Sequence, residues 1–279
     1  MVLVHGAWHG AWCWEKVASL VGQAGHPVIA KDLPGHGLNA RAPQSFGEFP
    51  RSGAFASEPS PVSGITLSDY VSQIVQTVEA LLSQGSAPPV LVGHSMGGIA
   101  IQAAAEALGP TKLHRLVYLA AFMPANNASM ATYSNGSTQA DSKLRPLFIG
   151  NPGKVGAIRI DPRSSDSVYA SALTAAFYVD VDEDIVMMAR QFLTPDIPLK
   201  PIATPIQISS KSWGAIPRLY IRANMDAAVR PATQELMISQ ADAFTPGNLT
   251  RVIRVDSSHS PFFSQPRAIA EALIDQASI

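Results

Sequence analysis

The residues whose types and spacing most clearly indicate catalysis form a G-x-S-x-G motif at 93–97. Its sequence is G-H-S-M-G, with Ser95 at the centre. An apolar run at 90–92 precedes the motif, and an alanine-rich stretch through Leu108 follows it. The order strand, sharp turn, helix is typical of a nucleophile elbow, in which a strained backbone lifts a serine hydroxyl off the edge of a sheet. The sequence therefore predicts Ser95 as a nucleophile and the Met96 amide, at a helix N-terminus, as a donor to an oxyanion.

A serine hydroxyl needs a base within hydrogen-bond reach, and that base needs a group that orients it. In hydrolases that carry this elbow, the acid and then the histidine follow the serine along the chain. His259 is the one histidine beyond residue 204, and Asp226 is the first carboxylate after an apolar run at 219–222. We expect His259 as the general base and Asp226 as its acid, with Asp256, closer to His259 in sequence, as the less favoured alternative.

The loop after the first apolar run, His5-Gly6-Ala7-Trp8, is expected to supply a second donor to the oxyanion. Gly6 lets the backbone turn sharply, and we predict that the Ala7 amide donates. His5 is expected to bond backbone groups in this loop. His5 and His9 lie four residues apart without a third ligand, so we expect no metal, and no cofactor is implied.

Short apolar runs alternate with amphipathic stretches along most of the chain, which predicts an α/β fold. Six runs are expected to form a mostly parallel sheet, at 1–4, 28–30, 90–92, 116–119, 219–222 and 251–255. Helices that flank this sheet are expected at 13–24, 66–82, 97–108 and 231–243 and from residue 266 onward. The start at 66–69, T-L-S-D, is typical of a capping box.

Residues 125–204 break this alternation, because polar loops there enclose helical stretches at 168–178 and 184–192. We predict an inserted helical cap at 125–204 and an α/β core formed by 1–124 and 205–279. The polar segment at 38–64 is too long for an ordinary connection, and we expect function or mobility there.

The substrate pocket is expected to be apolar and lined by residues next to the predicted catalytic loops, namely Trp8, Phe122, Met123 and Phe262. Arg222 and Arg230 flank the expected acid loop, but we expect both to be solvated. We therefore identify no arginine or lysine that is placed to bind a carboxylate or phosphate.

The composition excludes several classes of protein. The formal net charge of the 279 residues is -1, which argues against a nucleic-acid partner. The chain has neither the pattern of a signal peptide nor an apolar run long enough to span a membrane. Its one cysteine, Cys13, is no indication of an oxidising compartment. We expect a cytoplasmic protein, and an apolar cap surface is compatible with a homodimer.

Together these motifs resemble the α/β-hydrolase superfamily, and most closely its branch of plant methyl-ester esterases, hydroxynitrile lyases and bacterial carboxylesterases, some of which act on pyrethroid esters. The resemblance rests on V-L-V-H-G-A-W-H-G-A-W-C-W (2–14), D-L-P-G-H-G (32–37), L-V-G-H-S-M-G-G (91–98), A-A-F-M-P (120–124) and H-S-P-F-F (259–263). It implies Ser95 as nucleophile, His259 as base, Asp226 as acid and the Ala7 and Met96 amides as the oxyanion hole.

Two departures bear on the reaction. Hydroxynitrile lyases of this branch carry a threonine where Gly6 stands and a lysine where Ser260 stands, so cyanohydrin lysis is disfavoured. We expect a serine carboxylesterase that hydrolyses small to medium hydrophobic esters, aromatic esters or lactones included, through an acyl-enzyme. The alternatives are a hydroxynitrile lyase or C–C hydrolase on the same triad, or a ligand receptor on a hydrolase scaffold.

Overall fold

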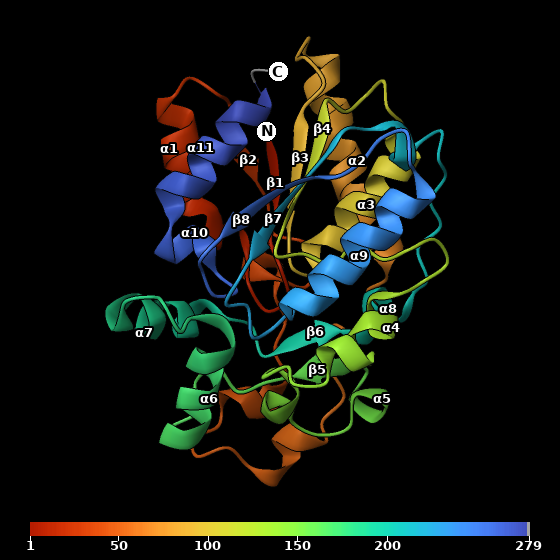
Figure 1. Cartoon of the computed structure of the whole chain (residues 1–279). Coiled ribbons are helices and arrows are strands. Elements are labelled where there is room, and N and C mark those ends of the chain that lie inside the picture. The colour runs from red at the N-terminus through yellow and green to blue at the C-terminus, as the bar shows by residue number, and fades with distance from the viewer. Residues whose placement is uncertain (278–279) are drawn as a thin grey trace.

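The computed structural model describes residues 1–277 and shows a six-stranded sheet in the order β2-β1-β3-β4-β7-β8, with every neighbouring pair parallel (Figure 1). This arrangement confirms the predicted α/β fold. The strands are β1 (Val2–Val4), β2 (Ile29–Ala30), β3 (Val90–His94), β4 (Arg115–Leu119), β7 (Arg218–Ala223) and β8 (Arg251–Val255).

Helices cover both faces of the sheet (Figure 1). One layer consists of α1 (Glu15–Gln23), α10 (Pro261–Ser264) and α11 (Pro266–Ala277), and the other of α2 (Leu67–Ser83), α3 (Gly97–Leu108) and α9 (Pro231–Phe244). Alternate strand residues supply the two hydrophobic cores. Leu91 and Leu116 pack in the core beneath α2 and α3, while Val92 and Val117 pack in the core beneath α1 and α11.

Local signals place several of these elements. The predicted capping box is present at the start of α2, where the Asp69 carboxylate accepts the Thr66 N–H at 2.8 Å. The helix expected from residue 13 begins instead as a 3₁₀ turn, Ala11–Trp14, that leads into α1. Other 3₁₀ turns are Gly37–Asn39, Gln44–Gly47, Gly53–Ala56, Ser137–Gln139, Arg145–Leu147 and Trp213–Ala215. None of the helices within residues 1–277 is both long and apolar enough to cross a membrane.

Most of the chain between β4 and β7 lies below the carboxyl ends of the sheet strands in Figure 1 and forms a layer there. The helices expected at 168–178 and 184–192 are α6 (Ser167–Phe177) and α7 (Glu183–Phe192). This layer also holds a two-stranded antiparallel sheet that the sequence did not indicate, because its strands have three residues each and include Asp196 and Pro198. Its elements are α4 (Met130–Ser134), α5 (Pro152–Val155), β5 (Ala157–Arg159), β6 (Asp196–Pro198) and α8 (Leu199–Ala203).

The long polar segment before α2 packs against this layer through specific bonds. The Ser60 N–H donates to the carbonyl of Val155 at 2.8 Å. The Arg159 guanidinium in β5 binds both carboxylate oxygens of Asp196 at 2.7 Å, and it also donates to the carbonyls of Phe55 and Glu58. Arg159 and Asp196 are both fully buried, so this ion pair fastens the segment to the β5–β6 sheet.

We predict that Arg159→Met lowers the free energy of unfolding by about 3–5 kcal/mol, because it leaves the Asp196 carboxylate buried without its partner. Urea denaturation followed by circular dichroism measures the change. Arg163→Met, at an exposed arginine nearby, is the matched control. Adding Asp196→Leu to Arg159→Met should recover part of the loss, and wild-type stability in the single variant would contradict the prediction.

Candidate active site

Ser95 lies at the turn between β3 and α3 with a backbone φ of 52°, a left-handed value that is strained for a residue with a side chain. Glycines on both sides make the turn possible. A Cβ at Gly93 would lie 2.9 Å from the backbone of Gly97, and a Cβ at Gly97 would lie 2.6 Å from the carbonyl of His5. The local sequence therefore produces the elbow because only hydrogen fits at these two positions.

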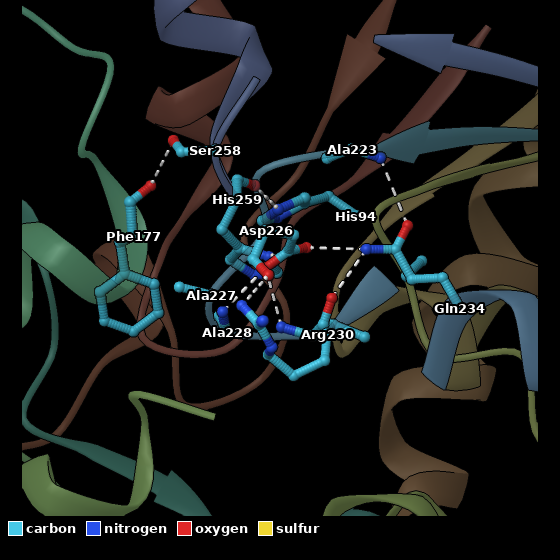
Figure 2. A network of polar contacts seen from close by, with 12 residues as sticks. His94, Phe177, Ala223, Asp226, Ala227, Ala228, Arg230, Gln234, Ser258 and His259 are labelled. Carbon is cyan, nitrogen blue, oxygen red and sulfur yellow. Dashed lines mark hydrogen bonds and ion pairs between the residues drawn. The ribbon is translucent and has the colours of Figure 1, made fainter. Parts of the chain in front are cut away.

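His259 and Asp226 form a buried pair on the loops that follow β8 and β7 (Figure 2). The His259 Nδ1–H donates to Asp226 Oδ2 at 2.8 Å. The other carboxylate oxygen, Oδ1, accepts the N–H groups of Ala228 and Val229 at 2.8 Å each, and the Gln234 amide donates to Oδ2 at 3.1 Å. These donors fix the carboxylate, which in turn fixes the tautomer of the imidazole and leaves Nε2 as the acceptor.

The alternative acid, Asp256, lies elsewhere. Its Oδ1 accepts the side-chain amide of Asn224 at an exposed position, and its backbone carbonyl accepts the amide of Gln265. The loop around Asp226 is tied to the histidine loop by backbone bonds, since the Met225 N–H donates to the carbonyl of Ser257 at 3.0 Å. Of the two carboxylates, Asp226 is therefore the one in contact with His259.

Neither the Ser95 hydroxyl nor His259 Nε2 has a hydrogen-bond partner among residues 1–277. Both groups are thus free for a reacting molecule. The absence of a bond between Ser95 and His259 is compatible with catalysis, because catalytic hydrogen bonds are often long in enzymes without substrate. The preceding residue, His94, supports the histidine loop, because its Nε2–H donates to the carbonyl of His259 at 2.9 Å and its ring lies 4.7 Å from the His259 ring. Burial lowers the pKa of His94 well below its usual value, so this ring is neutral.

The backbone N–H groups of Ala7 and Met96 have no acceptor in the part of the chain that the structure describes. Met96 precedes α3, so its amide also benefits from the positive end of a helix. The loop that carries Ala7 is held from the other layer, where the Thr194 N–H donates to the carbonyl of Trp8 at 2.9 Å. Two free donors beside a serine are the arrangement that an oxyanion requires.

Gly6 lies directly against the elbow. A Cβ at this position would meet the Ser95 Cβ at 2.7 Å and His94 Nδ1 at 2.8 Å, so no side chain fits there without displacing Ser95. His5 bonds backbone groups, as predicted: its Nδ1–H donates to the carbonyl of Gly6 and its Nε2 accepts the Leu33 N–H. Burial lowers the pKa of His5 to about 4, so it stays neutral at physiological pH.

A cavity of about 290 Å³ opens at Ser95 between the sheet and the layer below it. Trp8 and Phe122 line it, as predicted, together with apolar and polar residues of that layer, among them Met130, Phe148, Phe177 and Ile202. Met123 and Phe262, which were predicted for the pocket, lie in the core instead. Met123 is buried in the core beneath α2 and α3, and the Phe262 ring packs on the rings of Trp14 and His94.

Residues of the layer between β4 and β7 also hold the loops that carry Asp226 and His259, which the sequence alone did not reveal. Gln139 and Ser142 donate to the carbonyl of Ala228, two residues from Asp226 (Figure 2 shows this loop). The Asp180 carboxylate accepts the N–H of Ser258, the residue before His259, at 3.0 Å. These contacts join residues about 80 to 90 positions apart in sequence, so no local pattern could have indicated them.

Comparison with known proteins agrees with this fold. A model described as the alpha/beta hydrolase family matches residues 1–272. The chain is 31% identical over 284 residues to a putative chloroplastic methylesterase 11 of Arabidopsis thaliana, covering 100% of this chain. A crystal structure of the pyrethroid hydrolase PytH is similar in fold, with a TM-score of 0.78, 24% identity and coverage of 99% of this chain and 96% of that one. Polyneuridine aldehyde esterase gives a TM-score of 0.73 at 25% identity, covering 99% and 98%.

The chain spans 64%, 56% and 55% of the lengths of three chloroplastic relatives, the putative methylesterases 11, 13 and 15 of Arabidopsis thaliana. Within residues 1–277, no cluster of three His, Cys, Asp or Glu side chains could hold a metal ion. The match of the family model to nearly the whole chain, the parallel sheet and the serine elbow all agree. This protein belongs to the alpha/beta hydrolase family.

Proposed function

We propose that the protein is a serine carboxylic ester hydrolase that works through an acyl-enzyme. The observation that carries the proposal is Ser95 on its strained turn, at the end of a cavity and beside two free backbone amides. The His259–Asp226 pair supplies a base in the required tautomer. Relatives and structural neighbours named methylesterase, pyrethroid hydrolase and polyneuridine aldehyde esterase support the same reaction class.

The reaction follows from these groups. His259 Nε2 takes the proton of the Ser95 hydroxyl as its oxygen attacks the ester carbonyl carbon. The negative charge that develops on the carbonyl oxygen is stabilised by the Ala7 and Met96 amides. The imidazolium, held by Asp226, then protonates the leaving alcohol, and the acyl group remains on the serine. A water molecule, deprotonated by the same histidine, hydrolyses the acyl-enzyme and releases the acid.

The cavity favours small to medium hydrophobic esters. Its volume of about 290 Å³ lies near the lower limit of small-molecule sites, about 300–1,000 Å³. Aromatic rings from Trp8, Phe122, Phe148 and Phe177 form part of its wall, so aromatic esters and lactones are suitable substrates.

Cyanohydrin lysis is disfavoured because the elbow leaves no room for the side chain that hydroxynitrile lyases carry at the position of Gly6. The position equivalent to the lyase threonine is Gly6, where even a Cβ would collide with Ser95. The position equivalent to the lyase lysine is Ser260, whose hydroxyl is buried. Neither polar group that handles a cyanohydrin is available, which leaves ester hydrolysis as the reaction that the site supports best.

We predict that Ser95→Ala lowers kcat on the order of 10⁴ to 10⁶-fold, because the triad acts as a unit. Release of p-nitrophenol from acetate, butyrate and octanoate esters measures the loss, and thermal unfolding checks that the variant is folded. Retention of most of the activity would exclude Ser95 as the nucleophile. A wild-type protein that binds these esters without turnover would instead favour a receptor.

We predict that Asp226→Asn lowers kcat about 10⁴-fold, since an amide at this position favours the wrong imidazole tautomer. Asp256→Asn is the matched control, because Asp256 follows the neighbouring strand but bonds Asn224 instead of His259. The same p-nitrophenyl esters measure both variants. Equal losses in the two variants would contradict the assignment of Asp226 as the acid.

A further inference from the structure

One wall of the cavity differs from the rest. Most lining residues are apolar, but the stretch from Ser134 to Arg145 brings five polar side chains to one side of the cavity, namely Ser134, Asn135, Gln139, Ser142 and Arg145. Arg145 is the one cationic residue in the lining of this cavity, and no aspartate or glutamate lines it. The wall therefore carries a single formal charge at the edge of an apolar space.

Two of these polar side chains already form hydrogen bonds within the protein. Gln139 donates to the carbonyl of Ala228 and accepts the Arg230 N–H, and the Ser142 hydroxyl donates to the carbonyl of Ala228. Asn135 and Arg145 are different, since both are exposed at the mouth of the cavity and bond each other. Arg145 Nη2 donates to Asn135 Oδ1, which orients the guanidinium and leaves its other N–H groups and the Asn135 amide nitrogen free.

Arg145 also lacks a counter-ion. Carboxylate partners are present for Arg51 (Asp161), Arg159 (Asp196) and Arg230 (Asp141), whereas Arg163 and Arg190 donate to backbone carbonyls. No carboxylate of residues 1–277 lies within 4 Å of the Arg145 guanidinium. A guanidinium offers a planar pair of N–H donors that matches a carboxylate, and the adjacent Asn135 amide adds another donor.

We propose that Arg145 and Asn135 form a binding site for a carboxylate at the far end of the substrate, so that the preferred substrates are half-esters of dicarboxylic acids. This proposal rests on the proposed esterase function, because it specifies the substrate of the same cavity. The ester group lies at Ser95, an apolar chain fills the cavity, and the distal carboxylate lies at its mouth. Cationic substrates are disfavoured by the same charge.

Matched methyl esters test this directly. Methyl hexanoate, octanoate and decanoate are compared with the monomethyl esters of adipic, suberic and sebacic acids, in which a carboxylate replaces the terminal methyl group. The small alcohol part leaves the acyl chain to reach the cavity mouth. We expect kcat/KM to be at least about tenfold higher for the half-ester at the best chain length, and the preference to weaken with added salt.

Arg145→Gln should lower the ratio of the two kcat/KM values about tenfold, and Arg145→Lys should restore part of it, because lysine keeps the charge without the planar fork. Arg163→Gln is the control, since Arg163 is an exposed arginine outside the cavity lining, and it should leave the ratio unchanged. A ratio of one in the wild type, or a preference that survives Arg145→Gln, would overturn the proposal.

A binding measurement tests the carboxylate site independently of ester hydrolysis. In Ser95→Ala, titration with monomethyl suberate and with methyl octanoate is followed by tryptophan fluorescence, because Trp8 lines the cavity. We expect the half-ester to bind at least about tenfold more tightly, and Arg145→Gln in the same background to remove the difference. Equal affinities would overturn the carboxylate site, whereas preferential binding without turnover in the wild type would overturn the esterase alone.

Discussion

The proposed active site depends on how closely three backbone segments approach one another at the elbow. A Cβ at Gly6 would meet the Ser95 Cβ at 2.7 Å, and a Cβ at Gly98 would meet the carbonyl of Phe122 at 2.1 Å. The loop after β1, the start of α3 and the loop after β4 are thus in contact around one strained serine. Because the interior is close-packed, this contact fixes the serine, the free amides and the end of the cavity together.

Three buried histidines lie near this point and do not compete with His259, the proposed base. Burial lowers the pKa of His5 to about 4 and that of His9 to about 3, and it lowers the pKa of His94 well below its usual value. All three rings are therefore neutral at physiological pH and hold neighbouring segments together by hydrogen bonds. His9, for example, bonds the carbonyl of Ala7 and the Tyr178 hydroxyl. In the proposed reaction the Asp226 carboxylate, bonded to His259 Nδ1, would stabilise an imidazolium at His259.

The sequence was sufficient wherever a short pattern determines the local structure. The capping box at Thr66, the serine elbow and the alternation of strands and helices are signals of this kind, and the fold followed from them. Side-chain direction was harder to predict. Met123 and Phe262 are buried in the hydrophobic cores and do not line the cavity, because adjacency in sequence does not determine side-chain direction in a loop. The short strands β5 and β6 pair through contacts between distant segments, which no periodicity encodes.

The segment from Ser134 to Arg145 lines the cavity and also contacts the loop that carries Asp226. Gln139 and Ser142 hold the carbonyl of Ala228 and so fix the loop that orients Asp226, while Asn135 and Arg145 of the same segment face the cavity mouth. The wall and the acid loop are joined by buried hydrogen bonds, so displacing one strains the other. On the proposed function, a substrate that displaced this wall would therefore also shift the loop that carries Asp226. The proposed selectivity at the mouth and the orientation of His259 thus depend on the same set of contacts.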